Sequence, residues 1–284
     1  MRTKQEYIEG LRKKHPNLYF NGSKIDRLDP MQEGAINVMG LTFDAAFDPD
    51  LKDLCTATSH LSGKTINRFN HIHQCPDDLH KKQDMTRALC NQVGTCIQRC
   101  MGIDAANAIN AISFEAEKNP DRATDYHKNF LKWLEYFQEN DLIASCAQTD
   151  VKGERLKRPG QQTDPDQYLR VVEKKSDGIV VRGCKVHISE ASISDEILVV
   201  PNRALMKDES DYAVCFAIPS DHPEIKQVVS FHNPTRRELL KTPKKTGYTD
   251  SYIIFDDTFI PWERVFLCGE VDHGGIAALL FALF

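Results

Sequence analysis

Two cysteines four residues apart are the part of this sequence best suited to chemistry. Cys96 and Cys100 occur in TCIQRCMGID, within a stretch whose pattern predicts helix. Residues i and i+4 of a helix have Cβ atoms about 6 Å apart on one face, so two thiolates could bind one iron–sulfur cluster or metal ion. Free cysteine is also among the most buried residue types, so a simple core pair is the alternative. Two thiolates do not complete a site, because clusters and structural zinc normally need four ligands.

A second group of possible metal ligands lies in HIHQC. His71, His73 and Cys75 would share a face in an extended segment, which allows zinc without requiring it. Surface histidines with an unrelated cysteine are the alternative. No GxGxxG, P-loop or GxSxG pattern is present in the sequence, which weakens the case for the nucleotide-binding and hydrolase folds that depend on them.

Composition and charge favour a globular protein that acts on small molecules. The length of 284 residues predicts about two folded domains. A composition of 27% charged and 41% hydrophobic residues is typical of a globular protein. The net charge of −5 gives no basic surface for nucleic acid, and no apolar run is long enough to span a membrane. The N-terminus has no secretory signal pattern and the nine cysteines have no framework spacing. We therefore expect reduced thiols in the cytoplasm.

The first half of the chain is expected to position the cysteine pair. Residues 1–140 have helical periodicity and predict a helical N-terminal domain. Its longest helix is expected from Pro76 to Lys118 and contains the pair. A second helix is expected within 122–140, with an aromatic and leucine stripe on one face made of Tyr126, Phe130, Trp133, Leu134 and Phe137.

The second half has the texture of a β domain. Residues 141–270 alternate branched and polar side chains, with a hairpin predicted around KSDG at 175–178. The segment ASCAQTDVKGERLKRPGQQTDPD before the hairpin is rich in turn formers and charge, and is interpreted as a functional loop or an interdomain crossing. Residues 271–284 begin an apolar helix, interpreted as the start of a truncated C-terminal helical domain.

Several motifs in order resemble one family of flavoproteins. CIQRCMGIDAANAI, ASCAQTDVKGER, DPDQYLRVVEKKSDGIVVRGCKVHIS and FDDTFIPWERVF are similar to the family of 4-hydroxybutyryl-CoA dehydratase and flavin-dependent 4-hydroxyphenylacetate 3-hydroxylase. The CxxxC pair resembles the dehydratase branch. The resemblance implies an α+β, acyl-CoA-dehydrogenase-like fold with a helical N-terminal domain, a β-barrel or sandwich-like middle domain and a C-terminal helical domain. It also implies a homotetramer.

The resemblance further implies which residues bind cofactors. Cys96 and Cys100 match two of the three Cys and one His that hold a [4Fe-4S] cluster in the dehydratases, and the other ligands and the main base would lie beyond Phe284. Asp250 matches the place of an active-site acid, with a turn aspartate as the alternative. The implied FAD contacts fall on two segments: Ala147, Gln148, Thr149, Lys152, Gly153, Glu154 and Arg155, and then Val186, His187 and Ser189.

The implied reaction is the dehydration of 4-hydroxybutyryl-CoA, a CoA thioester, to crotonyl-CoA, with isomerisation of vinylacetyl-CoA. The β-proton is not acidic, so a flavin radical mechanism makes it removable while the cluster acts as a Lewis acid toward the leaving hydroxyl. An FAD-dependent aromatic hydroxylase is the alternative within the family. A non-catalytic half of a split enzyme is the alternative from another class, because the final helix has no cap and no polar tail.

Overall fold

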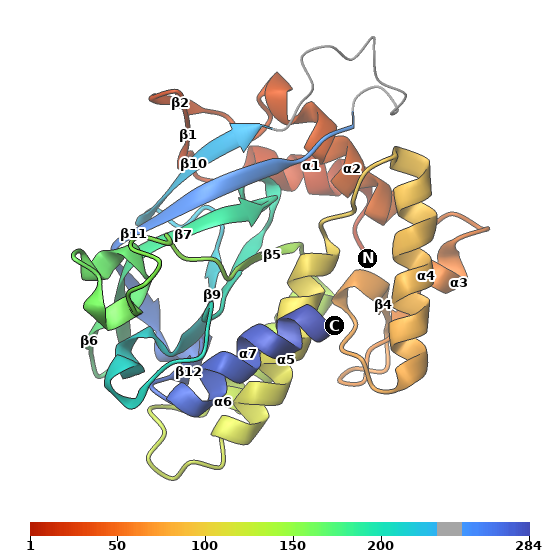
Figure 1. Ribbon diagram of the computed structural model, residues 1–284. Coiled ribbons are helices and arrows are strands. Elements are labelled where there is room, and N and C mark those ends of the chain that lie inside the picture. The colour runs from red at the N-terminus through yellow and green to blue at the C-terminus, as the bar shows by residue number, and fades with distance from the viewer. Residues whose placement is uncertain (232–245) are drawn as a thin grey trace.

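The computed structural model describes residues 1–231 and 246–284. The described residues form three β-sheets, one of which is a separate two-stranded pair. The two larger sheets lie on one side of the molecule and most of the long helices on the other (Figure 1). The helices are α1 Lys4–Arg12, α2 Glu33–Asp44, α3 Lys52–Cys55, α4 Pro76–Val93, α5 Cys100–Ala116, α6 Tyr126–Glu139 and α7 Val271–Leu283. The strands are β1 Leu18–Phe20, β2 Ser23–Ile25, β3 Thr56–Thr58, β4 Thr65–Asn67, β5 Ala144–Ala147, β6 Arg170–Lys174, β7 Gly178–Ser189, β8 Glu196–Val199, β9 Val214–Pro219, β10 Ile225–Phe231, β11 Thr249–Pro261 and β12 Val265–Cys268.

The larger sheet takes strands from both halves of the chain. Its order is β2-β1-β10-β11-β7-β6, and β1 pairs in parallel with β10, with Leu18 opposite Gln227. The expectation that 1–140 is helical is therefore incomplete, because 56–58 and 65–67 pair with each other as β3 and β4, and 18–25 forms two strands of the larger sheet. Leu18 is fully buried there and the Asn17 amide donates to the Ser220 carbonyl at 3.1 Å. Three-residue strands are too short to produce a periodic signal.

The main core lies between the two sheets and beneath α5 and α6. The smaller sheet has the order β12-β9-β8-β5. Phe216 on β9 meets Phe255 on β11 edge to face, with ring centroids 5.9 Å apart. On the helical side, Phe130 of α6 contacts Phe266 of β12 with centroids 5.6 Å apart. The aromatic stripe predicted for this helix is confirmed, since all five of its residues are buried.

The single long helix expected from Pro76 to Lys118 is wrong. The chain leaves α4 at Gly94, which adopts a left-handed φ of 66° and donates its N–H to the Cys90 carbonyl at 2.8 Å. Only at Cys100 does α5 begin. A glycine in this conformation is a common helix terminator, so Gly94 is the C-cap of α4 and not an interior residue of one long helix. Cys96 consequently lies in a connecting loop and not on the same helix as Cys100.

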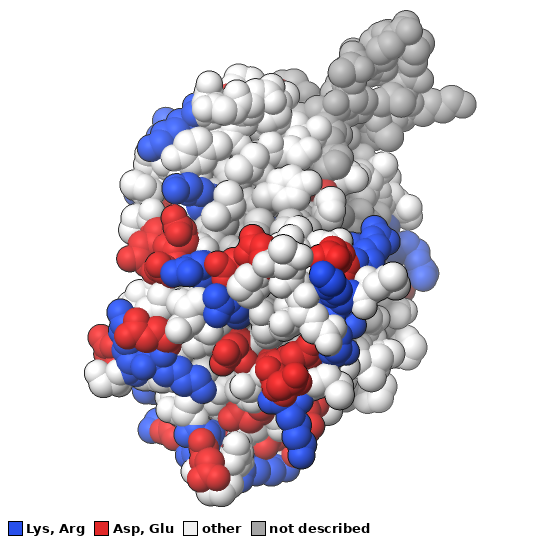
Figure 2. Space-filling view, turned by 60° about the vertical axis from the view of Figure 1, so that its left-hand side comes forward, with Lys and Arg blue, Asp and Glu red and all other residues white. Residues whose placement is uncertain are grey.

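The hairpin and the terminal helix agree with expectation. β6 and β7 pair across the turn at KSDG, where Lys175 N–H donates to Gly178 O at 2.8 Å. Residues 271–283 form α7. Charges of both signs are interspersed on the face shown in Figure 2. Among the residues that the structure describes, no helix combines the length and apolar character needed to cross a bilayer.

Candidate functional site

The loop between α4 and α5 is held by two buried residues that lie between the two cysteines. Ile97 is fully buried among α2 and α4 side chains, and Arg99 is only 2% exposed. Cys96, in contrast, is exposed, and Cys100 is partly exposed at the start of α5. Ile97 and Arg99 therefore anchor the loop in the interior, while the thiol of Cys96 lies at the surface and that of Cys100 lies partly at the surface.

Arg99 is the stronger of the two anchors. Its guanidinium donates to Asp141 Oδ1 at 2.6 Å and to Thr42 Oγ1 at 2.9 Å, and it lies 4.4 Å from the centre of the Phe43 ring. Burial alone would lower the pKa of Arg99, and Asp141 opposes that effect. A guanidinium buried with a matched carboxylate holds its position tightly, because breaking such a pair leaves a charge unpaired in the interior.

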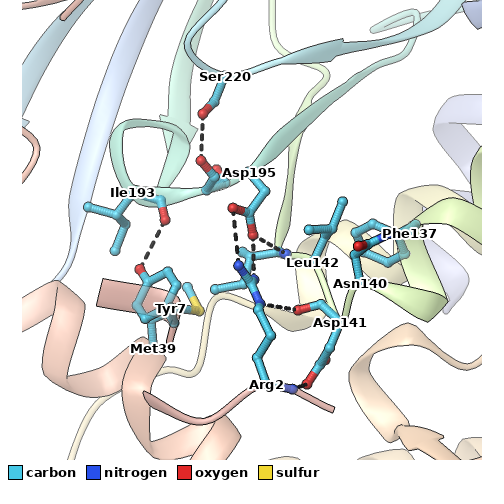
Figure 3. A network of polar contacts seen from close by, with 12 residues as sticks. Arg2, Tyr7, Met39, Phe137, Asn140, Asp141, Leu142, Ile193, Asp195 and Ser220 are labelled. Atoms are coloured by element: carbon cyan, nitrogen blue, oxygen red, sulfur yellow. Dashed lines mark hydrogen bonds and ion pairs between the residues drawn. The ribbon is translucent and has the colours of Figure 1, made fainter. Parts of the chain in front are cut away.

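The same aspartate connects the cysteine loop to the N-terminus and to the start of β8. Arg2 N–H donates to Asp141 Oδ2 at 3.0 Å, and Arg2 Nη2 lies 2.5 Å from Asp195 Oδ2 (Figure 3). Asp195 in turn accepts the N–H of Ile143 at 2.9 Å. Residues far apart in sequence thus form one buried ionic network, which fixes the cysteine loop relative to the smaller sheet.

The chemistry of the two thiols suits metal binding. Cys100 Sγ lies 3.0 Å from the Ile97 carbonyl oxygen, which competes with Cys96 for the single thiol proton of Cys100. Hydrogen bonds from Cys100 and Cys90 lower the pKa of Cys96 to about 6, while the pKa of Cys100 is raised. Because thiolates and not thiols ligate metals, the lowered pKa makes Cys96 the thiol of this loop that could most readily serve as a metal ligand. Within 1–231 and 246–284, no three His, Cys, Asp or Glu side chains converge as a metal site.

The zinc alternative at HIHQC finds no support. His71 Nε2 lies 3.2 Å from Asp78 Oδ2 and Cys75 Sγ lies 3.6 Å from the same oxygen. His73 does not join them, and burial lowers its pKa to about 4. No metal-binding group is found there in the described part of the chain.

The two segments expected to contact FAD lie side by side. Val186 N–H donates to the Thr149 carbonyl at 2.8 Å, and the Lys185 ammonium donates to the Gln148 carbonyl at 2.8 Å. Lys185 also forms a buried ion pair with Asp150 at 2.9 Å. Ala147 is buried at the end of β5. This pairing brings 147–150 against the end of β7, although Asp150 and Lys185 are 35 positions apart in the sequence.

The charged part of the loop is open to solvent. Lys152, Gly153, Glu154 and Arg155 are exposed. Glu154 pairs with Lys157 at 2.7 Å, whereas Lys152 and Arg155 form no ion pair with another described residue. Two unpaired cations beside exposed backbone fit an anionic group such as a pyrophosphate. The residues present therefore fit FAD in the donor chemistry they offer.

The end of β7 meets the beginning of β11. Ser189 Oγ–H donates to Asp250 Oδ1 at 2.8 Å. Asp250 is the second residue of β11 and is therefore not a turn residue. His187 has a left-handed φ of 56°, which turns its exposed ring to lie 5.8 Å from the Tyr252 ring. These contacts bring Ser189 and Asp250, two of the predicted site residues, together on one surface.

Several residues of this region have a burial or a pairing that no pattern in the sequence indicates. Arg99 lies within the cysteine motif, but nothing in the pattern indicates that it is buried. Lys185 and Asp150 are charged residues whose pairing needs the fold. Glu190 follows Ser189, is 2% exposed and adopts φ 59°. Glu196 is also buried, and it pairs with Arg264 at 2.7 Å.

The sequence of the chain is similar to one protein family and to several characterised proteins. Residues 3–267 match the family described as 4-hydroxyphenylacetate 3-hydroxylase N terminal. The chain is 42% identical over 288 aligned residues to 4-hydroxybutyryl-CoA dehydratase/vinylacetyl-CoA-Delta-isomerase of Clostridium aminobutyricum, covering 99% of this chain and 58% of that protein. It is 27% identical to the 4-hydroxyphenylacetate 3-monooxygenase oxygenase component of Thermus thermophilus, covering 95% and 56%.

Solved structures give the same picture. An oxygen-tolerant archaeal 4-hydroxybutyryl-CoA dehydratase from N. maritimus superposes with a TM-score of 0.90 at 33% identity, covering 97% of this chain and 56% of that one. The oxygenase component of 4-hydroxyphenylacetate 3-monooxygenase in complex with FAD has a TM-score of 0.79 at 26% identity, covering 98% and 58%. The chain spans a little over half the length of these relatives. It belongs to the 4-hydroxyphenylacetate 3-hydroxylase N-terminal family.

Proposed function

We propose that this chain is the N-terminal part of a 4-hydroxybutyryl-CoA dehydratase that also isomerises vinylacetyl-CoA. The observation that supports this most is the 42% identity to the Clostridium aminobutyricum protein of that name over nearly the whole chain, against 27% to the Thermus thermophilus oxygenase. The exposed Cys96 with its lowered pKa is consistent with this choice, because an aromatic hydroxylase has no evident need for a prepared metal ligand.

The predicted site residues divide between the two cofactors in this proposal. Cys96 and Cys100 would ligate a [4Fe-4S] cluster, and Arg99 would hold their loop in place through Asp141. Lys152 and Arg155 would bind the pyrophosphate of FAD, while the paired segments at Thr149 and Val186 would orient its ring. FAD and the cluster would supply one-electron chemistry and a Lewis acid when bound.

Asp250 would hold or accept a proton at its carboxylate, oriented by the hydrogen bond from Ser189. The substrate would be a CoA thioester. An acyl-CoA-dehydrogenase-like arrangement, in which a C-terminal helical domain completes the site within a homotetramer, belongs to the same proposal. The Cys-based site of this chain would then receive its remaining ligands from that domain.

The test is cofactor analysis of the complete gene product purified without oxygen. We expect FAD, about four iron atoms and acid-labile sulfide per subunit. Replacing both Cys96 and Cys100 by Ser should abolish iron binding and elimination of water from 4-hydroxybutyryl-CoA. The matched control is Cys75→Ser, which removes another exposed thiol and should leave both intact.

Two results would reject the dehydratase. One is iron content and water elimination that survive the double substitution. The other is a metal-free flavoprotein that hydroxylates a phenol with reduced FAD and oxygen, which would establish the family's hydroxylase chemistry instead.

A further inference from the structure

Glu190 is a buried acid that the proposed chemistry does not use. It follows Ser189 at the end of β7 and is only 2% exposed. Its backbone N–H donates to the Thr249 carbonyl at 2.8 Å, which ties it to the first residue of β11. The next residue of that strand is Asp250, so Glu190 lies behind the surface that Ser189 and Asp250 form.

The carboxyl group of Glu190 is poorly satisfied. One oxygen, Oε2, lies 3.3 Å from the Thr249 hydroxyl, while Oε1 has no hydrogen-bond partner among the described residues. Ser251, two residues along β11 on the side where Thr249 points, also has a buried hydroxyl without a partner there. Unsatisfied polar atoms in a native interior are uncommon and call for an explanation.

The backbone of Glu190 is also unfavourable. Its φ of 59° lies in the left-handed region, where a residue with a Cβ is strained and glycine is not. Glycine at this position would remove both the strain and the unsatisfied oxygen. A residue that keeps two such costs beside a functional surface is a candidate for a role in function.

The charged surroundings determine the form of the acid. The titratable groups that act on Glu190 are Asp250 from β11 and Cys96 from the cysteine loop, and both are anionic when ionised. Tyr7 of α1 lies close enough for Glu190 to raise its pKa. No cation contacts Glu190 among the described residues, and the buried guanidinium of Arg27 donates to the carbonyl of Ser192, two residues along the chain.

A buried carboxylate without a cation is too costly to persist, whereas a protonated carboxyl can be accommodated. We propose that Glu190 is a neutral carboxylic acid, and that it is a positioning residue for the strand end that brings Ser189 and Asp250 together in the proposed flavin and substrate site. Burial, reinforced by Asp250 and Cys96, raises the pKa of Glu190 well above its usual range, in agreement with this assignment. The assignment of a positioning role rests on the function proposed above, and the protonation of Glu190 does not.

The first test is infrared titration of the carboxyl groups. We expect the band of a protonated carboxyl at pH 7, where an ordinary Glu with a pKa of about 4.3 is ionised, and its loss in Glu190→Gln. Asp250→Asn should move the disappearance of that band to lower pH, because it removes a repelling charge. The proposal is overturned if the band is missing at pH 7, persists in Glu190→Gln, or titrates unchanged in Asp250→Asn.

The second test separates position from stability. Glu190→Gly should raise the thermal midpoint by about 2–4 °C, since it removes strain and an unsatisfied oxygen. It should nevertheless alter the pH profile of turnover. In the wild type we expect activity to fall as Glu190 ionises on the alkaline side, and Glu190→Gln should remove that limb.

Asn21→Gly, at an exposed left-handed residue between β1 and β2, is the matched control and should leave the infrared band and the pH profile unchanged. An alkaline limb identical in wild type, Glu190→Gln and Glu190→Gly would overturn the positioning role. A protein that bound no flavin would instead refute the proposed function, while the infrared result would still decide the protonation of Glu190.

Discussion

Arg99 Nη2 lies 2.6 Å from Asp141 Oδ1, and both side chains are almost completely buried. Arg99 directly precedes Cys100, while Asp141 lies just after α6 and also receives the N-terminal segment through Arg2. The position of the cysteine loop is thus determined by a residue 42 positions away in sequence.

Replacing Arg99 by Met should destabilise the fold by about 3–5 kcal/mol, because it leaves Asp141 buried without its cation. Urea unfolding measures this. Arg87→Met, on the exposed face of α4, is the control and should change the free energy of unfolding by less than about 0.5 kcal/mol. Equal effects of the two substitutions would show that the buried pair does not anchor the loop.

Cys96 should be the most reactive thiol of the metal-free protein near neutral pH. Its pKa of about 6 means that the thiolate predominates above that pH and is lost below it. The rate of iodoacetamide alkylation at Cys96, followed by mass spectrometry, should therefore reach half its maximum near pH 6. Cys100→Ala removes the main hydrogen bond to the thiolate and should move that midpoint upward.

The buried Cys146 serves as an internal reference for this measurement. Burial raises the pKa of its thiol, so it should remain unmodified in the folded protein. Alkylation of Cys146 as fast as that of Cys96 would contradict the environments described for the two thiols.

Lys185→Met should weaken FAD binding and lower stability by about 3–5 kcal/mol. The substitution leaves Asp150 as an unpaired buried charge and frees the Gln148 and Val200 carbonyls. Adding Asp150→Leu removes the stranded charge and should recover part of the stability in urea unfolding. The FAD affinity, measured by flavin fluorescence, should stay low in the double variant.

The comparison of single and double variants is decisive here. If the double variant were as unstable as Lys185→Met alone, the stranded charge would not be the cause. If both variants bound FAD as the wild type does, the pairing of 148–150 with β7 would have no part in flavin binding.

Asp250→Asn should lower the turnover of the complete enzyme by about 10²–10⁴-fold if Asp250 transfers a proton. Ser189→Ala, which removes only the orienting hydrogen bond at 2.8 Å, should have a smaller effect. Asp256→Asn is the control, since Asp256 is exposed further along β11. A steady-state rate unchanged in Asp250→Asn would remove this residue from the site.

The sequence by itself determined the elements with strong local signals. The aromatic stripe of α6, the hairpin at KSDG and the apolar α7 are encoded by periodicity and turn chemistry within a few residues. The motifs around Cys96 and Cys100 and along β7 and β11 were sufficient to recognise the family. These features are visible without a fold because each depends on neighbours in the chain.

Only the tertiary structure decided how those motifs become a site. Gly94 ends α4 in a left-handed conformation instead of lying within a longer helix, and the chain beyond it buries Ile97 and Arg99 before α5 begins. Pairing of Asp150 with Lys185 and of Arg99 with Asp141 joins segments that share no local pattern. Charge burial is a property of the assembled interior, so the protonation of Glu190 and the exposure of Cys96 could not be read from residue types alone.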